Sequence, residues 1–327
     1  MRKKNSKSIS DIAKALNINT STVSRALRQL PSISAETTRK VLLEAQKQGY
    51  FKAERKNVAI ITPHCQIANY DLGILNALQL QLEQSNISWE IIDSSNIHII
   101  PERLIHGIIS LDFRDKKSSH LIDLCNLPIV AINEEPNASG KVYSVHSDAK
   151  NGMLQAMTHL KKLGHRKVIY LHRKINNFCS CNRRQAFCEI AKTLGNVVWQ
   201  TQEICITNEN RDEFMDFIFS IMQKGFSAVI IEGETGSIFA CNHLCRAGIK
   251  IPEELSIIGW DSPGLSNYTI PALTAIGQNF TALAEAAVNT LNTIWDGGTP
   301  QLIQEFPYLF FERESTGTFA AEKHSSK

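Results

Sequence analysis

Residues 8–27, SISDIAKALNINTSTVSRAL, have the pattern of two short amphipathic helices joined by a tight turn. Ser8 can cap the first helix, and Asp11, three residues later, can close a capping box. Asn17 suits the turn because asparagine tolerates a left-handed backbone, and Asn19 can cap the second helix. Apolar residues recur at helical spacing in both segments: Ile9, Ile12, Ala13, Leu16, Val23, Ala26 and Leu27. The pattern therefore predicts a helix-turn-helix.

The polar face of the second helix indicates binding to DNA. Hydroxyl groups bond phosphates or base edges, and arginine can hold a guanine through two hydrogen bonds. This face carries Thr20, Ser21, Thr22, Ser24, Arg25 and Arg28. A solvated helix pair could have the same face, but the charge distribution favours nucleic acid. Residues 1–57 contain 13 Lys or Arg and 4 acidic residues, a net charge of +9, whereas the whole chain is at +3.

A third helix and a short linker complete the N-terminal part. Ser34 can cap this helix, Glu36 lies in its first turn, and Gly49 can end it. We therefore expect a DNA-binding head over residues 1–50. The basic linker, residues 51–57, is seven residues long. Fully extended, it spans at most about 23–25 Å.

From residue 58 onward, buried strands alternate with helices, the order that produces parallel sheets with right-handed crossovers. Strands are expected at 58–62, 89–92, 107–111, 129–132, 142–145, 167–171, near 204, and at 228–231, 255–258 and 308–312. Helices are expected at 71–84, 118–125, 151–163, 183–194, 212–224, 237–247 and 282–295. The segment between Asp93 and Gly107 is short, so its crossover helix should be reduced.

Two similar halves of this kind predict an α/β body, residues 58–317, made of two Rossmann-like parallel-sheet subdomains with a cleft at the carboxyl ends of the strands. We expect lobe 1 to comprise about 58–160 plus 277–298, and lobe 2 about 161–276 plus 305–317. Residues 318–327 are expected to be a disordered tail.

Composition excludes several classes. No apolar run reaches the roughly 18 residues of a membrane helix. The basic N-terminus lacks a following apolar segment, so we expect a cytoplasmic protein without a secretory signal and without a membrane partner. The eight cysteines should then be reduced, and none has the paired spacing of a zinc site. No glycine-rich phosphate loop is present. We expect no metal and no cofactor.

Several strings resemble the LacI/GalR family of bacterial transcription regulators. In the head they are ISDIAKAL from Ile9, TVSRAL from Thr22, SAETTRKV from Ser34 and the pair Gly49-Tyr50. In the body they are HLKKLGHRKV from His159, IPEELSIIGWD ending at Asp261, PALT from Pro271 and REST from Arg313. The resemblance covers essentially the whole chain. It implies a head followed by a periplasmic-binding-protein-like body, acting as an effector-controlled repressor, and a homodimer on a palindromic double-stranded operator.

The resemblance also implies which residues contact DNA. Bases are touched by the first residues of the second helix and by the Arg after its Val-Ser pair, here Thr20, Ser21 and Arg25. The full expected set, phosphate contacts included, is Ser8, Thr20, Ser21, Thr22, Ser24, Arg25, Arg28, Ser34 and Thr37.

The linker departs from the family. Members usually follow Gly-Tyr with Pro-Asn and a hinge helix whose Leu enters the minor groove and bends the DNA. FKAERKN, residues 51–57, has neither Pro nor Leu. Such bending is therefore not carried over to this chain. The segment is either a basic tether, touching phosphates through Lys52, Arg55 and Lys56, or a plain solvated linker.

An effector site is expected at the carboxyl ends of the strands. Asp261 follows a predicted strand, where a carboxylate can accept two sugar hydroxyls. The resemblance places the effector-contacting arginine at Arg183, the acidic position at Asp148 and an aromatic residue at Tyr70. Asp148 and Asp261 could instead be cap or loop carboxylates, and Arg183 a surface charge.

Glu234 falls where the family commonly has the Asp of an Asn-Asp pair, and Gly233 replaces the amide. This change indicates a different or weakened set of effectors. A sugar, a sugar derivative or a nucleoside fits an arginine combined with an aspartate. The expected effector-binding set is Tyr70, Asp148, Arg183, Glu234 and Asp261.

Two other classes of protein account for fewer of these features than a regulator does. A cytosolic solute-binding protein could use the same body without regulating anything, but it would not need the basic head. An enzyme would need a nucleophile–base pair or a cofactor motif, and the sequence contains neither. We therefore expect a non-enzymatic protein with no catalytic residues.

Overall fold

The computed structural model describes residues 8–28, 30–50, 55–63, 69–111, 127–134, 142–174, 177–204, 206, 210–261 and 264–319. These residues belong to two compact units. Unit 1 takes the described residues up to 67 together with 75–145 and 284–304, and unit 2 takes 68–74, 146–283 and those from 305 onward. Each unit contains one six-stranded sheet.

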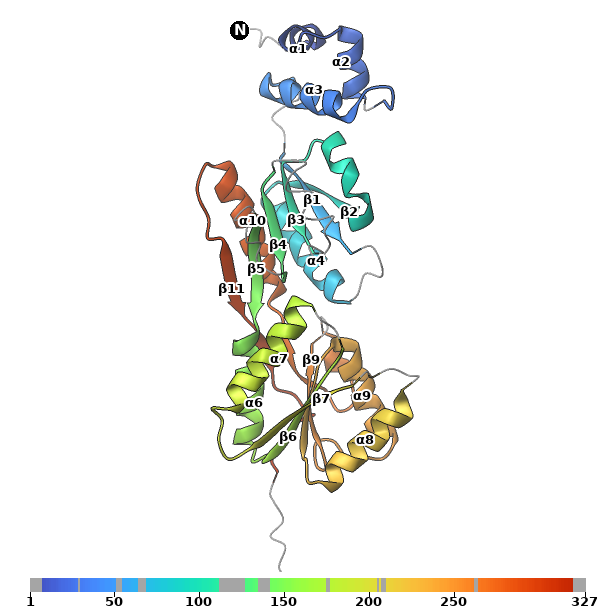
Figure 1. The fold of residues 1–327 in the computed structure, drawn as a ribbon, viewed down its shortest axis with the longest axis vertical. Coiled ribbons are helices and arrows are strands. Elements are labelled where there is room, and N and C mark those ends of the chain that lie inside the picture. The colour runs from blue at the N-terminus through green and yellow to red at the C-terminus, as the bar shows by residue number, and fades with distance from the viewer. Residues whose placement is uncertain are drawn as a thin grey trace, which may run out of the picture. The chain divides into compact units, whose positions relative to one another are not determined.

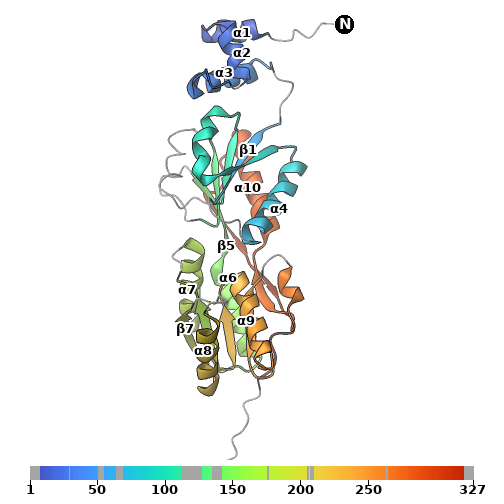
Figure 2. The ribbon, with the colours of Figure 1, turned by 90° about the vertical axis from the view of Figure 1, so that its right-hand side faces the viewer.

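The head consists of three helices, α1 (Ile9–Leu16), α2 (Thr20–Leu27) and α3 (Ala35–Lys47), as the sequence predicted (Figure 2). The Ser8 N–H donates to Asp11 Oδ2 at 2.9 Å, as expected for the acidic arm of a capping box. Asn17 takes the left-handed turn with φ 53°. A small apolar core holds the helices together. Its fully buried members are Ile12, Val23, Ala26, Val41 and Ala45.

The sheet of unit 1 has the order β11-β5-β4-β3-β1-β2 (Figure 1). Its strands are β1 (Asn57–Thr62), β2 (Ser88–Asp93), β3 (Gly107–Ser110), β4 (Ile129–Ile132), β5 (Val142–Asp148) and β11 (Ile303–Pro307). The strand pairs β2–β1, β1–β3, β3–β4 and β4–β5 are parallel. The associated helices are α4 (Asn69–Gln84), the 3-10 segment η1 (Ser94–Glu102) and α10 (Phe280–Trp295). The short η1 confirms the reduced crossover, while the predicted helix 118–125 lies outside the described residues.

The sheet of unit 2 has the order β12-β10-β9-β8-β6-β7. Its strands are β6 (Lys167–His172), β7 (Val198–Glu203), β8 (Ala228–Ile231), β9 (Ser256–Trp260), β10 (Thr274–Gly277) and β12 (Leu309–Phe311). The strand pairs β10–β9, β9–β8, β8–β6 and β6–β7 are parallel, and the pair β10–β12 is antiparallel. The helices are α6 (Ala149–Lys162), α7 (Phe178–Ala191), α8 (Arg211–Gln223), α9 (Glu234–Arg246) and the short η2 (Leu265–Tyr268).

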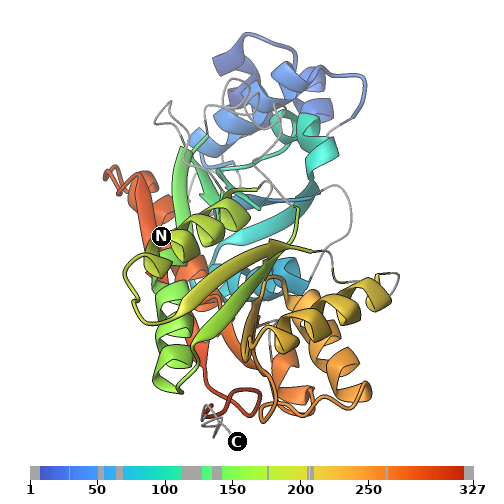
Figure 3. The ribbon, with the colours of Figure 1, turned by 60° about the horizontal axis from the view of Figure 1, so that its bottom comes forward.

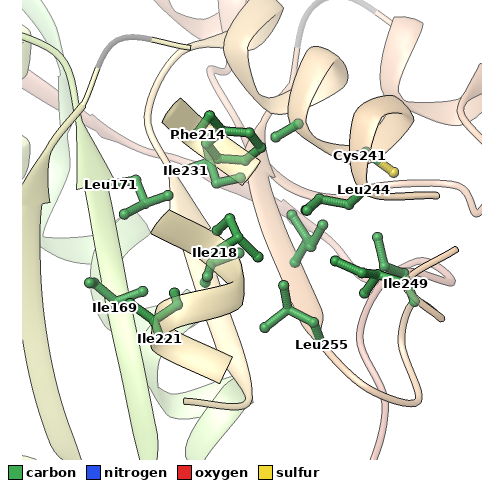
Figure 4. Close-up of a cluster of buried hydrophobic side chains, with 14 of the residues drawn as sticks. Ile169, Leu171, Phe214, Ile218, Ile221, Ile231, Cys241, Leu244, Ile249 and Leu255 are labelled. Carbon is green, nitrogen blue, oxygen red and sulfur yellow. The ribbon is translucent and has the colours of Figure 1, made fainter. Parts of the chain in front are cut away.

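Alternate strand residues of unit 2 enter two different cores. Val168 and Tyr170 pack with residues of α6 and α7. Ile169 and Leu171 pack with residues of α8 and α9, the cluster drawn in Figure 4. The two helix pairs thus cover opposite faces of the sheet, as Figure 3 shows. A parallel sheet buried on both faces needs such continuous apolar strands, and this rigid layer fixes where each strand ends.

The boundary between the halves differs from the prediction. Unit 2 begins at His146 rather than near 161. The reason is packing, because Met153, Met157 and Leu160 of α6 lie in one core with strand residues of unit 2. The return through unit 1 likewise begins at 284 rather than 277, since Thr274–Gly277 pairs with β9 as a strand that sequence reasoning did not predict.

The expected disordered tail was placed too early. The N–H of Phe319 donates to Leu163 O at 2.8 Å. Its ring stacks on His165, with 5.6 Å between ring centroids. The chain is therefore held in place through residue 319, and the remainder of the expected tail, residues 320–327, lies outside the described residues. Among the described residues, no helix has the length and apolarity to cross a membrane.

Candidate functional site

All nine residues predicted to contact DNA lie at the surface of the head. Six are exposed and three are half-buried; the exposed ones are Ser8, Thr20, Ser21, Arg25, Arg28 and Ser34, and the half-buried ones are Thr22, Ser24 and Thr37. The first turn of α2 carries no acidic residue. The positive end of this helix is therefore not neutralised by a side chain of its own first turn, which suits a phosphate or a base edge.

Ser34 has a structural partner in addition to its exposed position. The N–H of Thr37 donates to Ser34 Oγ at 3.3 Å, and the two hydroxyl groups are 2.8 Å apart. This is the N-cap of α3 that the sequence predicted. The two hydroxyls are therefore fixed side by side before any DNA contact.

A second group of candidate residues gathers in unit 2, where parallel strands reach their carboxyl ends. Arg173 follows β6, Glu232 follows β8 and Asp261 follows β9. Because the carboxyl ends of parallel strands share one edge, these three charged residues are brought close together although 88 positions separate the first from the last. This edge is the candidate ligand site.

Arg183 is held at this edge by α7, which starts at Phe178, so the residue lies inside the helix rather than at its predicted beginning. Its guanidinium lies 4.7 Å from the ring centroid of Trp260 and donates to the Tyr308 hydroxyl at 3.2 Å. Nη1 lies 3.6 Å from Glu232 Oε1, and the Glu232 side chain is fully buried. Arg183 is therefore a fixed, largely buried cation rather than a surface charge.

Asp261 is also paired. Its Oδ2 accepts from Arg313 Nη2 at 3.3 Å, while Oδ1 is buried and has no hydrogen-bond partner. The guanidinium of Arg313 is anchored in turn, since Nη1 donates to Leu273 O at 2.6 Å. One carboxylate oxygen is thus used by the protein, and the other remains available to accept a ligand hydroxyl.

Glu234 is the first residue of α9 and is partly buried. Burial raises its pKa to about 7, Arg183 acts in the opposite direction, and the negative charges of Asp261 and Asp71 add to the rise. Asp71 lies in the first turn of α4 and is buried. Glu234 therefore sits within electrostatic reach of the same site.

Gly233, which stands where the family commonly has an amide, takes a backbone conformation that few other residues adopt. Its φ of +92° favours glycine. A Cβ at this position would lie 3.3 Å from Arg173 Nε. The guanidinium of Arg173 thus lies beside the position that a longer side chain would take.

The other two predicted effector residues have ordinary structural partners. Asp148 caps α6, because its Oδ1 accepts from the Asn151 N–H at 3.0 Å. Tyr70, in the first turn of α4, packs against Phe280, with 5.7 Å between ring centroids. An effector role for either residue stays a prediction.

Several buried polar atoms of the residues at this edge have no hydrogen-bond partner. Among the described residues they include Arg183 Nε, Tyr170 Oη and Asp261 Oδ1. Tyr170 is fully buried, and this burial raises the pKa of its hydroxyl. The nearby Glu232 raises that pKa further, whereas Arg183 lowers it. Buried polar groups are normally bonded to protein, water or ligand, so these atoms indicate where a ligand would bind.

Sequence reasoning missed four members of this site, namely Arg173, Glu232, Tyr308 and Arg313. One signal was present, because Glu232 directly follows the apolar strand AVII, the same position that singled out Asp261. Tyr308 and Arg313 come from the far end of the chain, and no local pattern connects them with Arg183. In the described part of the chain, no group of three or more His, Cys, Asp or Glu side chains could hold a metal ion.

Comparison with known proteins agrees with both the head and the body described above. Residues 8–52 match the lacI family of bacterial regulatory proteins, and residues 157–316 match the periplasmic binding protein-like domain. The HTH-type transcriptional repressor PurR of Haemophilus influenzae (strain PittEE) is 23% identical over 305 residues, which cover 86% of this chain and 89% of the relative.

Two solved structures show the same fold. One is the Lac repressor dimer bound to operator and the anti-inducer ONPF, with TM-score 0.65, 18% identity and coverage of 95% of this chain and 99% of that one. The other is a periplasmic binding protein/LacI transcriptional regulator from Alkaliphilus metalliredigens complexed with D-xylulofuranose, with TM-score 0.67, 17% identity and coverage of 80% and 99%.

A helix-turn-helix head followed by a periplasmic binding protein-like body defines the class of ligand-controlled DNA-binding regulators. The chain belongs to the LacI family of bacterial regulatory proteins, and it is a DNA-binding transcription regulator.

Proposed function

We propose that this regulator is a repressor that binds operator DNA through its head and responds to a small molecule bound at the carboxyl edge of the unit 2 sheet. The observation that carries the proposal is the surface of the head. Every residue expected to contact DNA lies on it, and Thr20, Ser21 and Arg25 project from one short helix. PurR and the Lac repressor, both named as repressors, support the direction of control.

The effector is a sugar, a sugar derivative or a nucleoside. Arg183 and Asp261 are the central contacts, with Glu234, Tyr70 and Asp148 as further candidates. The bound D-xylulofuranose in the Alkaliphilus regulator supports a carbohydrate-like ligand. The effector changes DNA affinity by as much as its own affinity differs between the DNA-competent and the incompetent states.

The protein works as a homodimer on a palindromic operator, since two identical heads related by a two-fold axis require two equivalent half-sites. It carries out no catalysis, and its location is the cytoplasm, where its DNA is. The Lac repressor dimer on its operator supports this arrangement.

A gel-shift experiment with the purified chain and DNA fragments from around its own gene tests the proposal. We expect a discrete complex with at least one fragment that survives an excess of unrelated competitor DNA. Absence of any specific complex would contradict the regulator reading in favour of a solute-binding protein with the same body. A thermal-shift screen of the same preparation against sugars and nucleosides tests the effector part.

A further inference from the structure

The candidate ligand site has more negatively than positively charged side chains, and most of its positive groups are already paired. Seven charged side chains are joined there by ion pairs or by their electrostatic effect on Glu234. Four are carboxyl groups and three are guanidinium groups: Asp71, Glu232, Glu234, Asp261, Arg173, Arg183 and Arg313. When all are ionised, the group carries a net negative charge.

Two of the three guanidinium groups are already paired with carboxylates of the protein. Arg183 lies 3.6 Å from Glu232, and Arg313 lies 3.3 Å from Asp261. The remaining one, Arg173, lies beside Gly233 and acts on Glu234. A phosphate group binds tightly where guanidinium forks are free to grip it in pairs, and Arg183 and Arg313 are not free in this way.

The atoms that remain available suit neutral hydroxyl groups. Arg183 Nε can donate a hydrogen bond, Asp261 Oδ1 can accept one, and the Tyr170 hydroxyl can do both. A sugar or ribose hydroxyl also donates and accepts, so adjacent hydroxyls can satisfy such a mixed set. A phosphate ester offers mainly acceptor oxygens and brings a charge of about −1.5 to −2 toward Asp261 and Asp71.

We propose that the unit 2 site binds an uncharged, hydroxyl-bearing ligand, a free sugar or nucleoside, and discriminates against the phosphate ester of the same molecule, with Glu234 as a specificity-determining residue. The proposal rests on the proposed effector role of this site. It also gives a physical meaning to Glu234 in place of the usual shorter acid, because a partly buried carboxyl within electrostatic reach of Asp261 and Asp71 adds to the repulsion of an anionic ligand.

The test uses the full chain and matched ligand pairs at pH 7.5, when Glu234 is largely ionised. The pairs are ribose and ribose 5-phosphate, glucose and glucose 6-phosphate, adenosine and AMP, and cytidine and CMP, with inorganic phosphate as a separate probe. Thermal shift gives an apparent Kd for each. We expect at least one neutral member to bind, its phosphate ester to bind at least about tenfold more weakly, and inorganic phosphate to have no effect.

The variants Glu234→Gln and Glu213→Gln separate a local from a general charge effect. Both change a glutamate in the first turn of a helix, and Glu213, in α8, is exposed and is not one of the seven charged side chains of the site. Glu234→Gln should reduce the ratio of the apparent Kd of the ester to that of the neutral ligand at least threefold. Glu213→Gln should leave this ratio unchanged.

Four results overturn the proposal. They are an ester that binds as tightly as its neutral partner, stabilisation by inorganic phosphate, an unchanged ratio in Glu234→Gln, and failure of every neutral member to bind. The last result counts because the proposal commits to these ligand classes. Gel shift on the same preparation keeps the two conclusions apart, since specific DNA binding without neutral-ligand binding refutes the ligand class and leaves the regulator standing.

Discussion

The head and the unit 2 site hold their functional side chains in opposite ways. In the head, six of the nine expected DNA-contacting residues are exposed, and all nine come from residues 8–37. In unit 2, Arg183, Glu232 and Asp261 are largely buried and come from separate elements, with Tyr308 and Arg313 added from near the end of the chain. The contrast teaches that a substitution in the head should change DNA binding without changing stability. A substitution in the unit 2 site should change ligand binding and stability together.

Substitution of Arg183 should have the largest effect and puts the coupling to a direct test. Arg183→Ala leaves the fully buried Glu232 carboxylate without its cation and removes the hydrogen bond to Tyr308. Breaking one partner of a buried ion pair costs about 3–5 kcal/mol, so the free energy of unfolding should fall by that order in denaturant titration.

The paired variant Arg183→Met with Glu232→Gln is the control for this prediction. It removes both charges, so it should recover much of the lost stability while the ligand response stays absent. Equal stability of the Arg183→Ala variant and the wild type would mean that the site is not built as a buried charge network, and the contrast with the head would disappear.

Arg25 tests the other half of the comparison. Arg25→Ala should abolish operator preference, with a loss of about 1–3 kcal/mol per half-site, because a base contact is local. The melting temperature should not change, since Arg25 is exposed on α2. Fluorescence anisotropy with operator and scrambled DNA measures the first quantity and a thermal melt the second.

Lys47→Ala is the matched control for Arg25, because it removes one exposed positive charge from α3 without touching the predicted recognition helix. It should weaken binding to both DNA sequences alike. Operator preference that survives Arg25→Ala would show that the base contacts lie elsewhere on the head.

Glu234 should make the stability of the ligand site depend on pH. Its pKa is about 7 in the folded protein and near 4.5 when unfolded, so the native state holds the proton over this range and the unfolded state does not. Stability is therefore fully present below about pH 4.5 and falls as the pH rises through 7. The fall attributable to this group is roughly 3 kcal/mol at most.

The variant Glu234→Gln should remove that fall and leave the protein more stable than the wild type at pH 8. Thermal melts from pH 5 to pH 8 measure the effect, with Glu213→Gln as the exposed control. If the melting temperatures of wild type and Glu234→Gln changed in parallel with pH, the Glu234 carboxyl would be solvated as the exposed side chains of the head are. The structure indicates the opposite.

Phe319 gives the smallest expected effect. Phe319→Ala removes the stacked ring from His165, whose pKa burial lowers to about 4. An aromatic pair of this kind contributes about 0.5–1.5 kcal/mol, so the melting temperature should fall by a few degrees while DNA binding is unaffected. An unchanged melting temperature would mean that the Phe319 ring adds nothing to the stability of unit 2.

Much of the fold was predictable because it follows from local patterns. The spacing of Ile12, Val23 and Ala26, the cap at Ser8 and the turn at Asn17 determine the three-helix head. Apolar runs such as AVII of β8 identify strands buried on both faces. β10 escaped prediction because four residues carry little periodic signal, and its pairing with β9 decides its state.

The candidate ligand site was only partly predictable. The resemblance to the family pointed to Arg183 and Glu234, and the place of Asp261 directly after a predicted strand pointed to that residue. Their partners were not found, because Glu232, Tyr308 and Arg313 reach them only through the order of the strands. For Asp148 the cap role, one of the two possibilities that the sequence left open, is present as a hydrogen bond to Asn151.

The sequence by itself determined the head, its charge, the succession of strands and helices, and membership of the LacI family, because each of these depends on neighbouring residues or on matching strings. Only the tertiary structure decided which carboxylates are neutralised. Whether Asp261 offers a ligand two oxygens or one depends on a guanidinium 52 positions later in the chain, and distance along the sequence gives no measure of that 3.3 Å contact.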